Sequence, residues 1–118
     1  MKTLKIGIMD REAFQQRLIA IAAGELTPKK DDPKVWFHSM KSVSEVLSDH
    51  NRKLLAIIRD EKPESITALA NMSSRAKSNV SRTLKTLEGY GIVKLVKQPN
   101  GTLIPKVNAT EFDIRLSA

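Results

Sequence analysis

The chain of 118 residues contains no cysteine, few aromatic residues and no long apolar stretch. Without cysteine it can form neither a disulfide nor a thiolate metal site, which is consistent with a reducing compartment. No apolar run approaches the roughly 20 residues that a membrane-spanning helix needs. The residues from Met1 to Lys5 are not followed by the apolar core of a secretory signal. We therefore expect a cytoplasmic protein with no membrane partner.

Residues that would indicate catalysis or metal binding are also scarce. His38 and His50 are twelve positions apart and have no further ligand at metal-binding spacing. The sequence has no glycine-rich phosphate loop, and its serines lack the histidine and acid of a hydrolase triad. We expect no enzyme activity, no metal and no cofactor.

The chain has a net charge of +7, and the excess is confined to one segment. Between Arg52 and Lys106 there are eleven basic and four acidic residues, whereas the rest of the chain has nine of each. A localised basic field attracts polyanions such as nucleic acids, because binding releases condensed counterions. Charge alone leaves a second interpretation open, namely a solvated basic surface that maintains solubility.

The first part of the chain predicts a strand followed by two helices. Apolar and polar residues alternate over residues 4–8, as in a strand. Asp10 is suited to cap a helix that ends at Gly24, and the proline-containing residues 25–33 predict a loop. A second helix is expected over residues 34–47 because four apolar residues fall on one helical stripe. These are Trp36, Met40, Val43 and Leu47.

The second part predicts three helices, a β-hairpin and a final strand. Ser48 and Ser65 are suited to cap the first two of these helices, and Pro63 ends the first. The polar residues 73–75 separate the second helix from the third, which Gly91 stops. The elements are helices from residue 49 to about 62, from 66 to about 72 and from 76 to about 90, a hairpin over 92–107 and a strand over 112–116.

Two short helices joined by a tight turn and followed by a basic hairpin are typical of a winged helix-turn-helix. The expected fold is therefore α+β and mostly α, with a strand-helix-helix extension before the winged helix. We expect residues 1–47 to serve dimerisation and residues 48–118 to form a DNA-binding domain with a C-terminal strand. The first and last strands each have one apolar face, so they should pair with each other, within one subunit or across two. The helices carrying Phe14 and Trp36 would build the dimer interface, unless they only cover the core of a monomer.

The helix over residues 76–90 has an apolar and a polar face. Val80, Leu84 and Leu87 lie in a narrow arc that should face the core, and Arg82 lies opposite. Arg82 can donate two hydrogen bonds to guanine, and Asn79 can bond adenine, while lysines and serines suit phosphates. Lysines in the hairpin could equally protect a sheet edge against aggregation. The residues expected to contact DNA are Arg75, Lys77, Ser78, Asn79, Ser81, Arg82 and Lys85, with Lys97 and Asn100 in the hairpin.

The segment Ser65–Val93 carries Leu69-Ala70, a polar turn, and then S-x-V-S-R-x-L-x-x-L-E-x-x-G-x-V from Ser78. It resembles the MarR-like and ArsR-like winged-helix transcription regulators. The whole layout is similar to a group of small prokaryotic predicted regulators that includes TumA-type antitoxins, and Phe37, Ser39 and Leu47-Ser48 fit its N-terminal pattern. The resemblance implies sequence-specific binding of double-stranded DNA, usually as a homodimer. Two departures are Ser73-Ser74, where glycine is common in the turn, and Ala68, where a capping-box glutamate is expected.

These observations predict a transcriptional repressor or autoregulator that reads the major groove with helix 76–90 and uses the hairpin 92–107 as its wing. The alternative is the antitoxin of a type II toxin–antitoxin pair, which would bind a cognate toxin protein and autoregulate its operon. The charge-balanced N-terminal half with Trp36 and Phe37 motivates it. Binding of single-stranded RNA is disfavoured, because such proteins use exposed aromatic residues and only Tyr90 lies in the basic segment.

Overall fold

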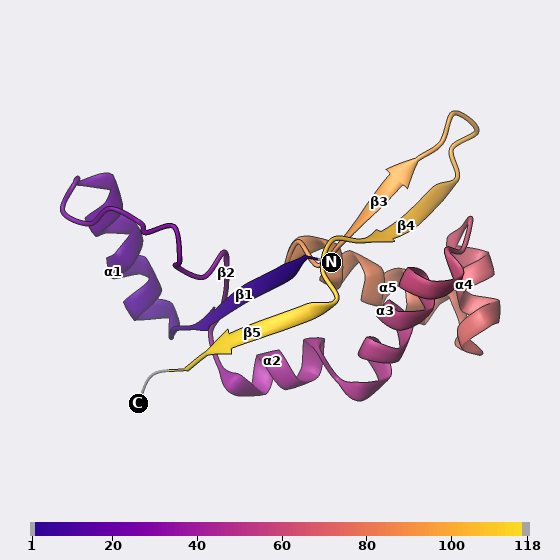
Figure 1. Cartoon of the computed structure of the whole chain (residues 1–118), viewed down its shortest axis with the longest axis horizontal. Helices are drawn as coiled ribbons and strands as arrows, with labels where there is room; N and C mark the ends of the chain where they lie inside the picture. Colours follow the sequence, from indigo (N-terminus) through magenta and orange to yellow (C-terminus); the bar gives the residue numbers. More distant parts are fainter. Residues whose placement is uncertain (1, 117–118) are drawn as a thin grey trace.

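A computed structural model describes residues 2–116 as an α+β fold with five helices and two small sheets (Figure 1). The hairpin projects from one end of the molecule, and the first helix lies at the other end. The elements in chain order are β1 (Thr3–Ile8), α1 (Arg11–Ala22), β2 (Val35–Phe37), α2 (Met40–Val46), α3 (Asp49–Glu61), α4 (Ile66–Ser73), α5 (Lys77–Gly89), β3 (Val93–Lys97), β4 (Leu103–Val107) and β5 (Glu111–Arg115).

Three helices begin at the capping residues that the sequence predicted. The side chains of Asp10, Ser48 and Ser65 accept hydrogen bonds from backbone amides three residues ahead, at 2.8, 3.2 and 3.0 Å. Each bond satisfies an amide that the helix itself leaves unpaired. The end of α3 is also confirmed, because Lys62 adopts a left-handed conformation directly before Pro63.

The predicted helix over residues 34–47 is wrong in its first half. Val35–Phe37 forms the strand β2, and the helix α2 begins only at Met40, capped by Ser39. Three successive β-branched and aromatic residues suit a strand, and β1 provides a partner for them. The extension before α3 is therefore strand-helix-strand-helix.

The three-stranded sheet has β1 in the centre, with β2 and β5 parallel to it on either side. Leu4 lies opposite Phe112 and Ile6 opposite Ile114, so β1 and β5 present their apolar residues on one face. The predicted pairing of the first and last strands is confirmed within one chain. Gly7 is required here, because a Cβ at this position would lie 2.4 Å from the Trp36 ring.

One apolar core contains residues from both ends of the chain. Phe37 of β2 is buried and stacks on Tyr90, with ring centroids 4.2 Å apart and planes 6° from parallel. The same cluster contains Ile6 of β1, Leu54 of α3 and Leu84 of α5. The N-terminal sheet thereby packs against the end of α5.

α1 contributes no buried residue to this core. Its Phe14 ring lies 6.4 Å from Trp36 and 5.9 Å from His38, and the Arg17 guanidinium lies 5.2 Å from the centre of the Trp36 ring. Among residues 2–116, no helix is both long enough and apolar enough to cross a membrane.

Candidate nucleic-acid interface

The turn between α4 and α5 sets the direction in which α5 leaves the helical core. Ser74 adopts the left-handed conformation, with φ of 56°, and the Arg75 amide donates back to the Ala70 carbonyl at 3.1 Å. A left-handed residue with a side chain costs free energy that glycine avoids, which explains why glycine is common in such turns. The serine nevertheless closes the turn with the same backbone hydrogen bond.

α5 has the two faces that its sequence predicted. Val80, Leu84 and Leu87 are 0% exposed, so this face is fixed in the core. Arg82 and Lys85 lie on the opposite, exposed face. Ser78 is exposed on the same side, four residues before Arg82. The buried apolar residues thereby fix the orientation of α5, so that Ser78, Arg82 and Lys85 face solvent.

The other predicted residues of α5 differ in how available they are. Lys77 and Asn79 are exposed in the first turn, and Ser81 is half-buried. Arg75 is half-buried too, and its guanidinium donates to the Asn51 side chain at 3.5 Å and to the Thr83 hydroxyl at 3.2 Å. This arginine therefore ties the turn before α5 to α3.

The N-terminus of α5 lacks the cap that the other helices have. A Ser or Asp side chain caps each of α1, α2, α3 and α4, whereas Ala76 precedes α5 and makes no side-chain bond. The amides of Lys77, Ser78 and Asn79 belong to the first turn, where helices leave their N–H groups unpaired. Together with the helix dipole, such amides suit an anion.

The hairpin places opposite each other two lysines that are not neighbours in the sequence. In the register of β3 and β4, Lys94 lies directly opposite Lys106, and both are exposed. Like charges opposite one another destabilise a β-ladder, so an external anion between them would be favourable. The list of expected contacts omitted both residues. Counting the strand register outward from the turn at Pro99-Asn100-Gly101 would have indicated that these two lysines lie opposite each other.

The tip of the hairpin holds the two residues that were predicted there. Lys97 is exposed at the end of β3. Asn100 is exposed as well, but its side-chain oxygen accepts the Thr102 amide at 2.9 Å. Gly101, with φ of 88°, completes the turn. The Asn100 side chain therefore stabilises the turn at the tip. Lys97 takes part in none of the ion pairs of the described residues, so its charge is available to an anion.

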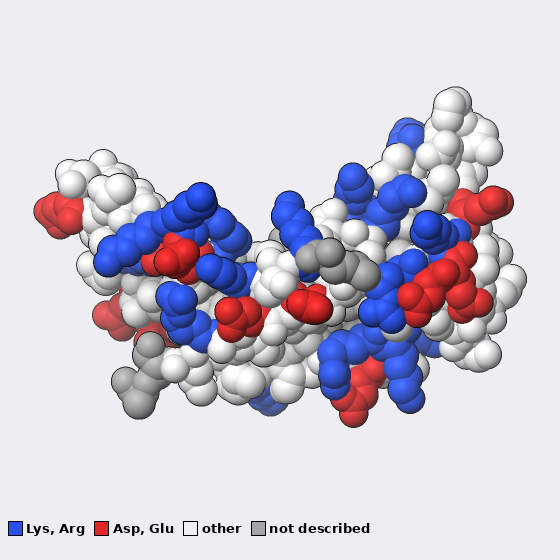
Figure 2. Space-filling model, in the orientation of Figure 1, with Lys and Arg blue, Asp and Glu red and all other residues white. Residues whose placement is uncertain are grey.

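Charges are distributed differently along the chain. All four ion pairs among the described residues lie between Lys5 and Asp60. The segment Arg75–Lys106 has Glu88 as its only acid, and none of its seven basic residues takes part in those pairs. In Figure 2, blue and red residues lie side by side over α1 and the following loop, whereas the hairpin carries blue ones alone. The unpaired residues are Arg75, Lys77, Arg82, Lys85, Lys94, Lys97 and Lys106.

In the segment Lys5–Asp60, the pKa values of two acids also reflect this pairing. The Lys29 amide and then Arg17, both donating to the carboxylate, lower the pKa of Asp32 from its usual value. The hydrogen bonds from Arg59 lower the pKa of Asp60 in the same way. Acids that pair with basic residues thus lie between Lys5 and Asp60, whereas α5 and the hairpin contain one acid, Glu88, which takes part in none of the four ion pairs.

The comparisons with known proteins bear on the same part of the chain. The model of a family described as HVO_A0114 matches residues 46–114, which include α3, α4, α5, the hairpin and most of β5. No curated protein matches the sequence.

Proposed function

The chain belongs to the HVO_A0114 family, and from that premise and the geometry above we propose that it is a winged helix-turn-helix regulator of the MarR-like kind. It binds double-stranded DNA in a sequence-specific manner as a cytoplasmic repressor or autoregulator. In this proposal α4, the Ser74 turn and α5 form the helix-turn-helix, and β3 and β4 form the wing.

The observation that carries the proposal is the set of seven unpaired basic residues on α5, its preceding turn and the hairpin. Neutralising DNA phosphates with such residues supplies most of the free energy of non-specific binding. Arg82 is the only arginine on α5, and it stands on the face that the core does not occupy. It is suited to bidentate hydrogen bonds with guanine in the major groove.

The remaining groups divide into phosphate contacts and supports. The first-turn amides of α5, together with Lys77 and Lys85, suit phosphates on the two sides of the groove. The opposed Lys94 and Lys106 and the tip residue Lys97 suit the backbone beside the wing. Arg75 acts mainly as a brace between α3 and α5, through Asn51 and Thr83.

We propose a homodimer as the DNA-binding form. A two-fold symmetric dimer presents its two recognition helices about 34 Å apart, or one turn of DNA. The operator is then an inverted repeat, and each half-site is read by one α5.

The experiment is selection of bound duplexes from a random pool at a fixed salt concentration, followed by affinity measurements over a salt series. The expected result is an enriched inverted repeat and an affinity that falls steeply as salt rises. Single-stranded DNA and double-stranded RNA of the same sequence serve as competitors. A pool that remains random at low salt, or stronger competition by either of these nucleic acids, would contradict the proposal.

A second candidate is an antitoxin that binds a toxin protein and also regulates its own operon. The observation that favours it is α1, where the neighbouring apolar residues Leu18 and Ile19 are 49% and 61% exposed. Exposed apolar groups that lie close together often mark protein-binding sites. Co-expression with the product of an adjacent gene tests this function. Relief of growth inhibition by the natural chain, lost in Ile19→Asp with DNA binding intact, is the expected result.

A further inference from the structure

The strand β5 has a free edge. It pairs with β1 on one side, and no other strand of residues 2–116 pairs with its outer side. In Figure 1, β5 runs beside β1, and no strand is drawn along its other side. A strand edge with unpaired amides and carbonyls is a template for another strand.

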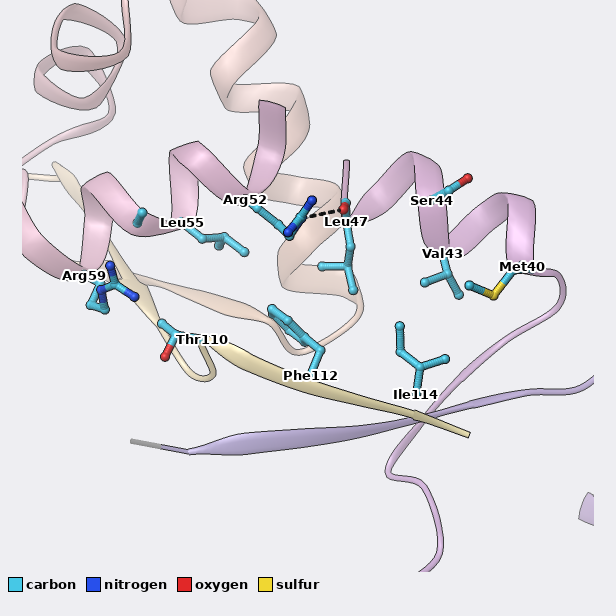
Figure 3. Close-up of a pocket in the computed structure, with 11 residues that line it drawn as sticks. Met40, Val43, Ser44, Leu47, Arg52, Leu55, Arg59, Thr110, Phe112 and Ile114 are labelled. Carbon is cyan, nitrogen blue, oxygen red and sulfur yellow. Dashed lines mark hydrogen bonds between the residues drawn. The ribbon is translucent and has the colours of Figure 1, made fainter. Parts of the chain in front are cut away.

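A mostly apolar groove of about 530 Å³ lies between β5 and the helices α2 and α3, with Arg52 and Arg59 among its lining residues. Figure 3 shows Phe112 and Ile114 pointing from β5 toward these helices. The groove is incompletely filled, because Ile114 is 38% exposed and Met40, at its end, is 48% exposed. Leu116 directly follows the last residue of β5 and is 63% exposed; if the strand is extended by one residue, it falls on the same face as Phe112 and Ile114.

We propose that β5 pairs with β5 of a second copy, antiparallel and about a two-fold axis at Ile114. In an antiparallel pair, residues equally far from the axis lie opposite each other and point to the same face. An axis between two residues would place apolar side chains opposite charged ones and turn one copy's buried face outward. The axis must therefore pass through a residue.

The charges of β5 select which residue this is. With the axis at Phe112, Glu111 would face Asp113 of the other copy, which places like charges opposite each other twice. With the axis at Asp113, Glu111 would face Arg115 on both sides, but Asp113 would face itself at the axis. With the axis at Ile114, Asp113 faces Arg115 on both sides of the axis, and no like charges meet. Opposite charges across a ladder stabilise it and like charges destabilise it, so the register at Ile114 is favoured.

The apolar residues support the same register. The axis at Ile114 places Ile114 opposite itself and Leu116 opposite Phe112, so Leu116 of one copy lies over the groove of the other. Neither Asp113 nor Arg115 takes part in the ion pairs of the described residues, so both are free to pair across the axis. The two three-stranded sheets become one sheet of six strands, in the order β2-β1-β5-β5-β1-β2.

This pairing specifies the contact of the proposed homodimer and rests on that part of the proposed function, but it does not depend on DNA binding. Because the contact is two-fold symmetric, it closes and does not continue into a fibre. The free edge is then covered in the assembled protein, which removes a site for aggregation.

Cysteine scanning tests the register in a chain that has no cysteine of its own. Ile114→Cys places the new thiol opposite its own copy, at a distance that a disulfide can bridge. Asp113→Cys places it one step away on the strand, opposite Arg115. Mild oxidation is expected to produce a covalent dimer of Ile114→Cys at least tenfold faster than one of Asp113→Cys. Faster cross-linking of Asp113→Cys would overturn the register.

Charge reversal tests the same contact without cysteine. Arg115→Asp places two acids opposite each other, and Asp113→Arg places two arginines opposite each other, so each variant is expected to dissociate at least about tenfold more readily. Mixed together, the two variants restore opposite charges on both sides of the axis and are expected to form a heterodimer. Glu111→Lys is the matched control, because this register places Glu111 opposite neither Asp113 nor Arg115.

Sedimentation of the full chain at micromolar concentration, without DNA, measures the oligomeric state of each variant. A monomer, or a dimer that both charge reversals leave intact, would overturn the proposal. Formation of the heterodimer also shows that both variants are folded, which circular dichroism checks independently. A dimer that binds no DNA refutes the proposed regulator and leaves the β5 contact standing. A monomer that binds a half-site does the reverse.

Discussion

Two parts of the molecule treat their basic residues in opposite ways. From Lys5 to Asp60, acids lie next to basic side chains and form all four ion pairs of the described residues. From Arg75 to Lys106, seven basic residues stand beside one acid, Glu88, and none of them forms an ion pair within residues 2–116. In the first part, ten basic residues stand among eight acids and four of them are paired, while the second part keeps a positive field that an outside anion can neutralise.

The difference matters because ion pairs on a surface contribute little to stability. Exposed pairs such as Lys5–Asp31 mainly reduce the positive potential of the surface, which makes it less attractive to a polyanion. In the second part, repulsion between Lys94 and Lys106 is built into the hairpin register. This repulsion makes the free protein slightly less stable than it would be with opposite charges at these two positions.

The largest expected effect comes from Arg82→Ala on α5. Losing a bidentate contact to guanine should weaken specific binding by about 1–3 kcal/mol and relax the base preference at one position in each half-site. Fluorescence anisotropy with the selected operator at fixed salt measures it. Arg11→Ala, an exposed arginine on α1, is the control and should leave the affinity nearly unchanged. An equal affinity for the natural chain and Arg82→Ala would show that α5 does not read the bases.

Lys94→Glu should move affinity and stability in opposite directions. The new carboxylate faces Lys106, so the free energy of unfolding should rise by roughly 0.2–1 kcal/mol. DNA affinity should fall at the same time, because a phosphate contact becomes a repulsion. Thermal unfolding and anisotropy on the same samples measure both. Lys41→Glu on α2 changes the net charge equally and should weaken binding less; equal losses would mean that only net charge matters.

Lys97→Ala at the hairpin tip should have a smaller and less selective effect. A lysine that contacts phosphate contributes about one released counterion, so the slope of log K against log salt should decrease by about one. All duplex sequences should be weakened alike. A loss confined to the operator would indicate a base contact in place of a phosphate contact.

The smallest expected effect concerns the paired part of the chain. The pKa of Asp32 is lowered in the folded state, so its contribution to stability is present above the unfolded pKa, near 3.8, and is lost as the pH falls through the lower folded value. Asp32→Asn should therefore unfold at a lower temperature than the natural chain at neutral pH, and the two should converge in acid. Asp31→Asn, whose carboxylate is 86% exposed, should show less of this change. Parallel curves down to low pH would contradict the assignment.

The parts of the structure that local chemistry determines were predictable from the sequence. Asp10, Ser48 and Ser65 cap the helices expected of them, and the face of α5 that holds Val80, Leu84 and Leu87 is buried. Capping depends on one side chain and the three residues after it, and the helical period depends on one turn. Neither requires knowledge of a distant partner.

The features that were missed depend on distant partners. Trp36 fits a helical stripe with Met40 and Val43, yet Val35–Phe37 is extended because β1 supplies its hydrogen bonds. The opposition of Lys94 and Lys106 depends on the hairpin register, which a residue-by-residue reading of charge does not reveal. The role of Arg75 depends on Asn51, which is 24 residues away in the sequence. Spacing along the chain specifies none of these contacts.

The stacked rings of Phe37 and Tyr90 have a practical consequence for anyone who shortens this protein. The family match begins at residue 46, so a fragment cut to that match would discard Phe37 together with β1. Tyr90 and the inner edge of β5 would then lie bare to water. We expect such a fragment to express poorly or to aggregate. The forty-five residues before it supply part of the core that packs against α5 and should be kept.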